Sequence, residues 1–138
     1  RGAIQFTTEE EPPVDETPPT ITARSINSAG TTLTLTFDEN TTGNAGFTIS
    51  ASGGAATLSS PSGSGTDSRT FTISRTIYSG ETVTLSYSAG DVVDESDNAL
   101  ATISGAAVTN NSTEEEPEPP EPVVLRVQTA TVGTLIKQ

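Results

Sequence analysis

Residues 31–37, Thr-Thr-Leu-Thr-Leu-Thr-Phe, alternate hydroxyl and apolar side chains, and this alternation constrains the fold more than any other feature of the chain. Side chains of a β-strand point to opposite faces with a period of two. Leu33, Leu35 and Phe37 would therefore share one buried face, while the threonines between them meet solvent. A helix would spread the same residues around its circumference and restrict the rotamers of the threonines. The pattern predicts a β-strand.

Six further segments show a similar pattern, separated by turn residues at intervals of roughly 8 to 12 residues. They are residues 20–26, 47–51, 55–59, 69–75, 82–88 and 103–109. No segment has a helical period. Strands with one apolar face each can bury it only against another sheet. We therefore predict an all-β fold, an antiparallel β-sandwich of about seven strands over residues 20–112.

Two matching proline-rich segments, residues 9–19 and 113–122, flank this predicted domain. Glutamates that repel one another and prolines that fix φ favour stiff, extended linkers. Outside the linkers lie two short apolar segments, residues 1–8 and residues 123–138. We expect the first to be strand-like, and the second to be either an assembly strand that pairs with neighbouring copies or the start of a next domain.

The net charge of −12 is concentrated in the linkers, which hold ten of the 18 acidic residues. Nucleic-acid phosphates and anionic lipid surfaces would repel such a chain, so neither is an expected partner. No apolar run is long enough to cross a membrane. We expect protein partners, including copies of the chain itself through residues 1–8 and 123–138. Because residue 1 is Arg and the chain contains no Met, we expect a processed product or a piece of a longer polypeptide.

The residue inventory argues against catalysis. His, Cys, Met and Trp are all absent, which removes histidine-based triads, thiol nucleophiles, disulfides, and imidazole or thiolate metal sites. The glycine-rich stretches 43–46 and 62–65 lie in predicted loops between strands and do not open a helix, so they are turn material and not phosphate loops. We expect no enzymatic activity, no catalytic residues and no cofactor.

The strongest polar constellation is acidic. Asp38 and Glu39 follow the predicted second strand, and Asp91, Asp94 and Asp97 precede the last one, so both groups belong at the same end of a sandwich. Converging carboxylates can bind Ca²⁺, which takes six to eight oxygen ligands, but the spacing does not match an EF-hand loop. The alternative is a solvated loop whose Asp and Asn side chains cap turns. We therefore assign no metal, and keep these five residues as calcium candidates.

Two arginines, Arg69 and Arg75, lie in the same predicted strand as Phe71 and Ile73. All four are at alternate positions, so they would face the same side of the sheet. We expect both to extend their charged groups to solvent from the ends of a buried strand and to pair with acidic residues there.

Four separated motifs resemble SwmB-type repeats and related bacterial immunoglobulin-like domains. They are residues 18–21 with 30–39, residues 79–87, the acidic loop 94–100, and the closing residues 107–111. The resemblance covers residues 18–112. It implies an immunoglobulin-like sandwich used as a spacer, stalk or adhesive module in extracellular, cell-surface or virion proteins.

The sequence thus favours a non-enzymatic structural or adhesive module. The alternative is an assembly subunit of a filament or phage particle whose terminal segments pair with neighbouring subunits. A calcium-dependent ligand-binding module is the third possibility.

Overall fold

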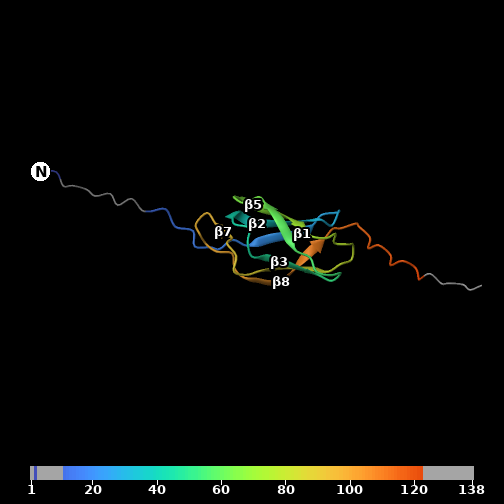
Figure 1. Ribbon diagram of the computed structural model, residues 1–138. Coiled ribbons are helices and arrows are strands. Elements are labelled where there is room, and N and C mark those ends of the chain that lie inside the picture. Colours follow the sequence, from blue (N-terminus) through green and yellow to red (C-terminus); the bar gives the residue numbers. More distant parts are fainter. Residues whose placement is uncertain (1, 3–10, 123–138) are drawn as a thin grey trace, which may run out of the picture.

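A computed structural model describes Gly2 and residues 11–122 and contains strands but no helix over these residues. The eight strands form a domain that lies between two extended segments (Figure 1). The strands are β1 (Ile21–Ile26), β2 (Thr32–Thr42), β3 (Phe47–Ala51), β4 (Leu58–Ser62), β5 (Thr66–Ile73), β6 (Val83–Tyr87), β7 (Val93–Asp94) and β8 (Ile103–Asn110). The prediction of an all-β fold is confirmed.

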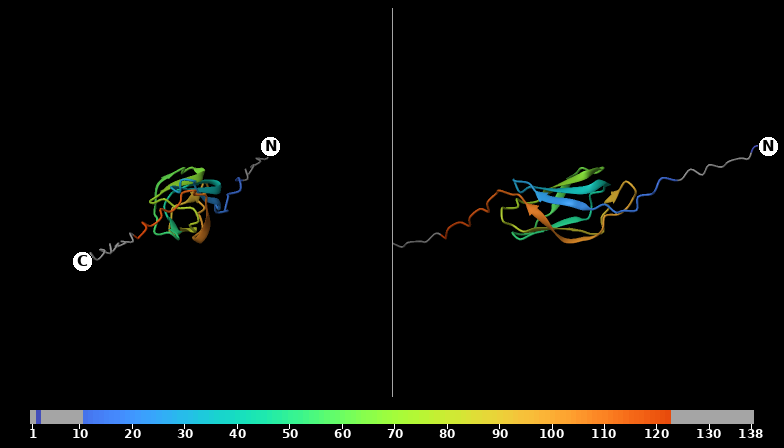
Figure 2. Two further views of the ribbon diagram at one scale, coloured as in Figure 1. Left: turned by 90° about the vertical axis from the view of Figure 1, so that its right-hand side faces the viewer. Right: turned by 180° about the vertical axis from the view of Figure 1, so that it is seen from behind.

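The strands form one mixed, nearly barrel-shaped sheet in the order β3-β6-β8-β1-β2-β5-β4, with β7 paired to the end of β2. Strands β1, β2 and β5 form one layer and β3 and β8 lie in the other, as the view from behind in Figure 2 also shows. The layers are joined where β1 and β8 pair in parallel, Ser25 with Thr109 and Ile26 with Asn110. The expectation of purely antiparallel pairing is therefore wrong at this one junction.

The core lies between the layers and follows the predicted alternation. Leu33 and Leu35 are fully buried and Phe37 nearly so, while the threonines between them are half-buried. The Phe47 ring packs against both Phe71 and Tyr87, with centroids 5.5 and 4.8 Å apart. Such aromatic contacts stabilise a core beyond the area they bury.

Four segments differ clearly from the sequence-based prediction, the first being the strand expected at residues 69–75, which lies at Thr66–Ile73. Strand β2 continues through residues 38–42, because its end pairs with β5 and then with β7. The fourth strand is shifted from residues 55–59 to Leu58–Ser62, where it pairs with β5 across an irregular register. The acidic loop contains the short strand β7, which brings the number of strands to eight.

The two arginines of the β5 region behave differently from each other. Arg75 forms the expected ion pair, with its Nη2 2.6 Å from Oε1 of Glu81. The expectation for Arg69 is wrong, because its side chain is completely buried. Arg69 donates hydrogen bonds to the carbonyl oxygens of Gly43, Gly63 and Thr41, and its guanidinium lies 5.3 Å from the centre of the Phe37 ring.

The flanking segments leave the domain at opposite ends (Figures 1 and 2). We call the end that receives residues 15–20 the entry end; it also holds the loops 43–46 and 91–98. The exit end holds the turns 27–30 and 77–81 together with residues 111–114. The predicted terminal segments, residues 1–8 apart from Gly2 and residues 123–138, lie outside the described residues. A search of the described residues for an apolar helix of membrane-spanning length found none.

Candidate functional site

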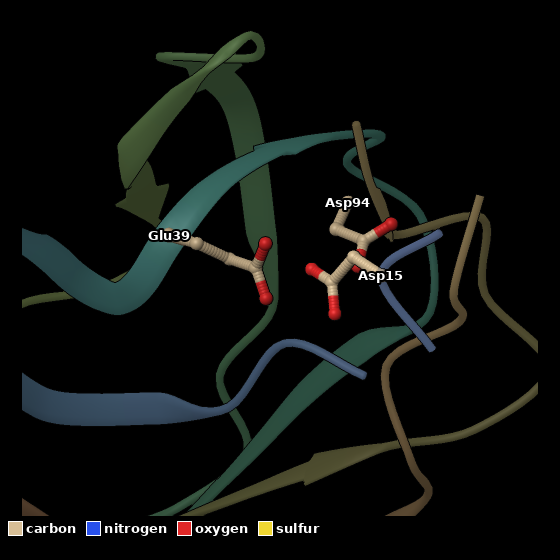
Figure 3. Close-up of side chains that lie close together, drawn as sticks. All are labelled: Asp15, Glu39 and Asp94. Atoms are coloured by element: carbon tan, nitrogen blue, oxygen red, sulfur yellow. The ribbon is translucent and has the colours of Figure 1, made fainter. Parts of the chain in front are cut away.

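Three carboxylates converge at the entry end. Asp15, Glu39 and Asp94 each place an oxygen within 4.8 Å of the other two. Figure 3 shows that they come from three elements: the incoming linker, β2 and β7. The pairing of Thr41 with Asp94 and of Thr42 with Val93 brings β7 alongside the end of β2. Two residues predicted as candidates, Glu39 and Asp94, thus meet because β2 is longer than the sequence indicated.

Asp94 is buried, with 3% of its surface exposed, and is fully engaged by its own turn. One carboxylate oxygen accepts hydrogen bonds from the amides of Ser96 and Asn98, both 2.8 Å. The other accepts a 2.8 Å hydrogen bond from the Asn98 side chain. Burial acts to raise the pKa of Asp94, but these hydrogen bonds outweigh it and lower the pKa below its usual value. Asp94 therefore stays ionised and holds the turn closed.

Glu39 shows the opposite behaviour. Partial burial, followed by the negative charges of Asp94 and Asp15, raises the pKa of Glu39 above its usual value. The one arginine that is fully buried among the described residues, Arg69, donates to backbone carbonyl oxygens and to the Thr41 hydroxyl, and forms no ion pair with Glu39. Glu39 is thus the carboxylate of the cluster whose ionised form is disfavoured by its surroundings.

Asp15 belongs to the linker and was not among the candidates from the sequence. Its carbonyl oxygen accepts a 2.9 Å hydrogen bond from the Asn98 side chain, and its carboxylate accepts one of 3.0 Å from the Thr17 amide. Asp15 lies shortly before β1, and the structure pairs β1 with the strand that carries Glu39, which brings the linker toward the cluster. The linker and the acidic turn are therefore joined through Asn98.

The other three candidates have separate surroundings. Asp38 accepts two hydrogen bonds from Thr20, one from the amide at 2.8 Å and one from the hydroxyl at 2.9 Å. Asp91 accepts hydrogen bonds from the amides of Asn44 and Ala45. Asp97 is exposed and has a positive φ of 66° within the acidic turn. Asp38 and Asp91 thus hold the backbone around them, and none of these three residues is part of the three-carboxylate cluster.

The cluster is a modest cation site at most. Ca²⁺ takes six to eight oxygen ligands, and three carboxylates supply only a part of that number. Both oxygens of Asp94 already accept hydrogen bonds, so a cation would compete with the amide donors that shape the turn. The arrangement suits attachment of the linker better than it suits tight metal binding.

A family model described as "putative flagellar system-associated repeat" matches residues 14–92, more than half of the chain. The chain belongs to this repeat family. The match confirms the resemblance to SwmB-type repeats, whereas the immunoglobulin-like part of that resemblance stays a prediction. It also supports a surface or structural repeat module in a surface or appendage context. No curated protein and no solved structure matched the chain.

The matched region of this flagellar-system-associated repeat includes Asp15 and Glu39 and ends before Asp94. The cluster therefore combines two residues from the matched region with one from the acidic turn that follows it. Within that turn, Asn98 donates hydrogen bonds to Asp94, and its side chain also donates to the Asp15 carbonyl oxygen of the incoming linker.

The repeat also has a shallow, mostly apolar groove of about 210 Å³ beside the start of β1. It is lined by Pro19, Thr20, Ile21, Arg24, Leu100, Ala101 and Ile103. Its one charged residue, Arg24, uses Nε to donate a 2.9 Å hydrogen bond to the Ala107 carbonyl oxygen. The groove therefore brings together no pair of groups suited to acid–base or nucleophilic chemistry.

Proposed function

We propose that this repeat is a non-enzymatic spacer module of a surface or appendage protein. In this role the domain holds its two flanking segments apart along one axis. The observation that carries the proposal is that residues 11–20 and 111–122 leave the domain at opposite ends (Figures 1 and 2). A module built this way adds its own length to any polypeptide that contains it.

Both flanking segments are attached to the domain where they meet it, which a spacer requires. At the entry end Pro19 is buried and Thr20 is bound to Asp38 by its amide and its hydroxyl. At the exit end the Thr113 amide donates to the Ser28 carbonyl oxygen at 2.9 Å, and the Ser79 amide donates to the Glu114 carbonyl oxygen at 2.7 Å. The direction of each segment is therefore fixed where it leaves the domain.

The exposed surface supports a spacer over an adhesive role. Among the described residues, Val14 in the linker is the only large hydrophobic residue that is exposed. Binding surfaces for proteins usually present larger contiguous apolar patches. The acidic linkers also repel one another, which keeps neighbouring modules apart.

The proposal is tested by measuring distances between labels. The chain contains no cysteine, so two introduced cysteines carry the only labels. We compare spin labels at Glu16→Cys and Glu115→Cys with labels at Glu11→Cys and Glu121→Cys. If the linkers continue outward as polyproline-like segments, the second pair is farther apart by up to about 34 Å. Replacing residues 11–18 by Gly and Ser should shorten and broaden that distance; equal distances for both label pairs would contradict a spacer.

Light scattering separates the spacer from the alternative assembly subunit. A spacer module should be a monomer whose mass falls only by the deleted segment when residues 123–138 are removed. Polymers that dissociate on that deletion would instead support a filament or particle subunit whose terminal segment pairs with neighbouring copies.

A further inference from the structure

The two strands that connect to the flanking segments occupy the middle of the sheet. In the order β3-β6-β8-β1-β2-β5-β4, β8 and β1 are neighbours with at least two strands on either side, and the edges are β3 and β4. Strand β1 pairs with β2 on its other side, and β8 pairs with β6. A pull on either flanking segment therefore acts first on an interior strand and not on an edge strand that could be peeled away.

The two strands also run in the same direction. Strand β1 starts at the entry end, β8 finishes at the exit end, and Ser25 and Ile26 pair in parallel with Thr109 and Asn110. Tension between the two flanking segments draws β1 toward the entry end and β8 toward the exit end (Figure 1). The strands are thus loaded along their length, and the hydrogen bonds between them run across the direction of pull.

Further hydrogen bonds extend this contact beyond the strand pairing. Arg24 Nε donates to the Ala107 carbonyl oxygen at 2.9 Å. The Asn111 amide donates to the Ile26 carbonyl oxygen at 3.2 Å, and the Thr113 amide to that of Ser28 at 2.9 Å. These bonds follow one another along the two strands, and each points across the direction of tension. Sliding one strand past the other must therefore strain several of them at the same time.

The exit end closes over the last part of this contact. The Ile77 amide donates to the Gly30 carbonyl oxygen at 2.8 Å, and Ile77 is fully buried. Gly30 has a φ of 69°, and a Cβ at this position would collide with the Ile77 carbonyl oxygen. Asn110 donates from its side chain to the carbonyl oxygens of Tyr78 and Glu81. The end of β8 is therefore held from two sides.

We propose that the β1–β8 contact is a shear clamp that allows the repeat to carry tension between its two flanking segments. The inference rests on the proposed spacer function and adds to it a mechanical role with a defined element. The contact resists sliding because its hydrogen bonds share the load. The same bonds would break one after another if two adjacent strands were pulled apart from one end.

The test compares two pulling directions in the full chain by single-molecule force spectroscopy. Handles at Glu16→Cys and Glu115→Cys load β1 and β8 in shear. Handles at Thr82→Cys and Glu115→Cys use two positions at the exit end and unzip β6 from β8, which pair antiparallel. We expect the unfolding force to be at least about twofold higher in shear than in unzipping at the same pulling speed. Equal forces, or a higher force in unzipping, would overturn the clamp.

A single substitution tests whether the resistance to force arises at the β1–β8 contact itself. Arg24→Met removes the hydrogen bond to Ala107 while keeping an apolar side chain beside the groove. We expect it to lower the shear force and leave the unzipping force unchanged. An equal drop in both directions would assign the effect to overall stability and count against the clamp. The measurement is independent of the spacer proposal, because a single domain gives a direction-dependent force even if labelled chains prove to be compact or polymeric.

Discussion

The entry and exit ends of the domain each contain an arginine from the β5 region, but they surround it with different partners. At the entry end Arg69 is buried and bonds to backbone carbonyl oxygens, while the three converging carboxylates form no ion pair with any described residue. At the exit end Arg75 holds Glu81 in a two-point ion pair, through 2.6 and 3.0 Å contacts. The entry end thus brings negative charges together, whereas the exit end pairs a negative charge with a positive one.

This difference gives Glu39 at the entry end and Glu81 at the exit end opposite responses to pH. Hydrogen bonds from Arg75, against a smaller opposing effect of burial, lower the pKa of Glu81 from its usual 4.5 to about 2. Glu81 therefore stabilises the fold in its ionised form. Glu39 has a raised pKa, so its ionised form destabilises the fold and protonation relieves the repulsion. Acidification thus removes a stabilising charge at Glu81 and an unfavourable one at Glu39.

The largest effect is expected from Arg69→Met. The substitution removes the donors that hold the end of β2 to the loops at Gly43 and Gly63. Leaving one buried and two partly buried carbonyl oxygens without these donors should lower the free energy of unfolding by about 3 kcal/mol. Urea unfolding measures this, with Arg24→Met as the matched control at a half-exposed arginine that makes one carbonyl contact. A loss no larger than that of the control would show that Arg69 does not hold the entry end together.

The next largest effect is expected from Glu81→Gln at the exit end. Its ionised carboxylate contributes fully above pH 4.5, and that contribution is lost as the pH falls toward 2. We expect the variant to lose about 2 kcal/mol of unfolding free energy at pH 7 and to match the parent near pH 2. Urea unfolding at several pH values measures the difference. Glu118→Gln in the exposed linker is the control, and a loss that did not change with pH would contradict the ion-pair explanation.

Much of the fold followed from the sequence because its strands alternate so regularly. Leu33, Leu35 and Phe37 are buried as predicted. The rule that every second residue of a strand faces the core failed where a β-bulge interrupts the alternation. The register of β1 against β2 shifts between Ile21 and Ala23, so Ala23 is exposed although strict alternation would place it on the same face as Ile21. A bulge depends on the partner strand, which the local pattern does not describe.

The site was harder to predict because it depends on pairing between distant segments. The sequence indicated that the carboxylates of the second strand and of the acidic loop would lie at one end, and Glu39 and Asp94 do meet there. It did not indicate Asp15, whose position depends on Asn98, 83 residues away, donating to its backbone. Nor did it indicate that Arg69 would be buried, because a charged residue in a strand is usually assigned to its exposed end.

Adjacent residues at the entry end provide a finer comparison. Hydrogen bonds from the amide and hydroxyl of Thr20 lower the pKa of Asp38, so its ionised form stabilises the fold. We therefore expect Asp38→Asn to lower the melting temperature at pH 7 and Glu39→Gln to raise it. The gain from Glu39→Gln should shrink as the pH falls and Glu39 becomes protonated in the parent. Shifts of the same sign for both variants would mean that the repulsion at Glu39 is not significant.

The smallest effect is expected from Ca²⁺. Repulsion at Glu39 favours a nearby cation, but both Asp94 oxygens are occupied by amide donors, so a calcium ion would lose ligands or open the turn. We expect the melting temperature in millimolar Ca²⁺ to equal that in NaCl of the same ionic strength. Glu39→Gln serves as the control, because it removes the charge that a cation would neutralise. A rise of several degrees in the parent that is absent in Glu39→Gln would show that the three carboxylates do bind calcium, and that the linker is fastened at the entry end by an ion.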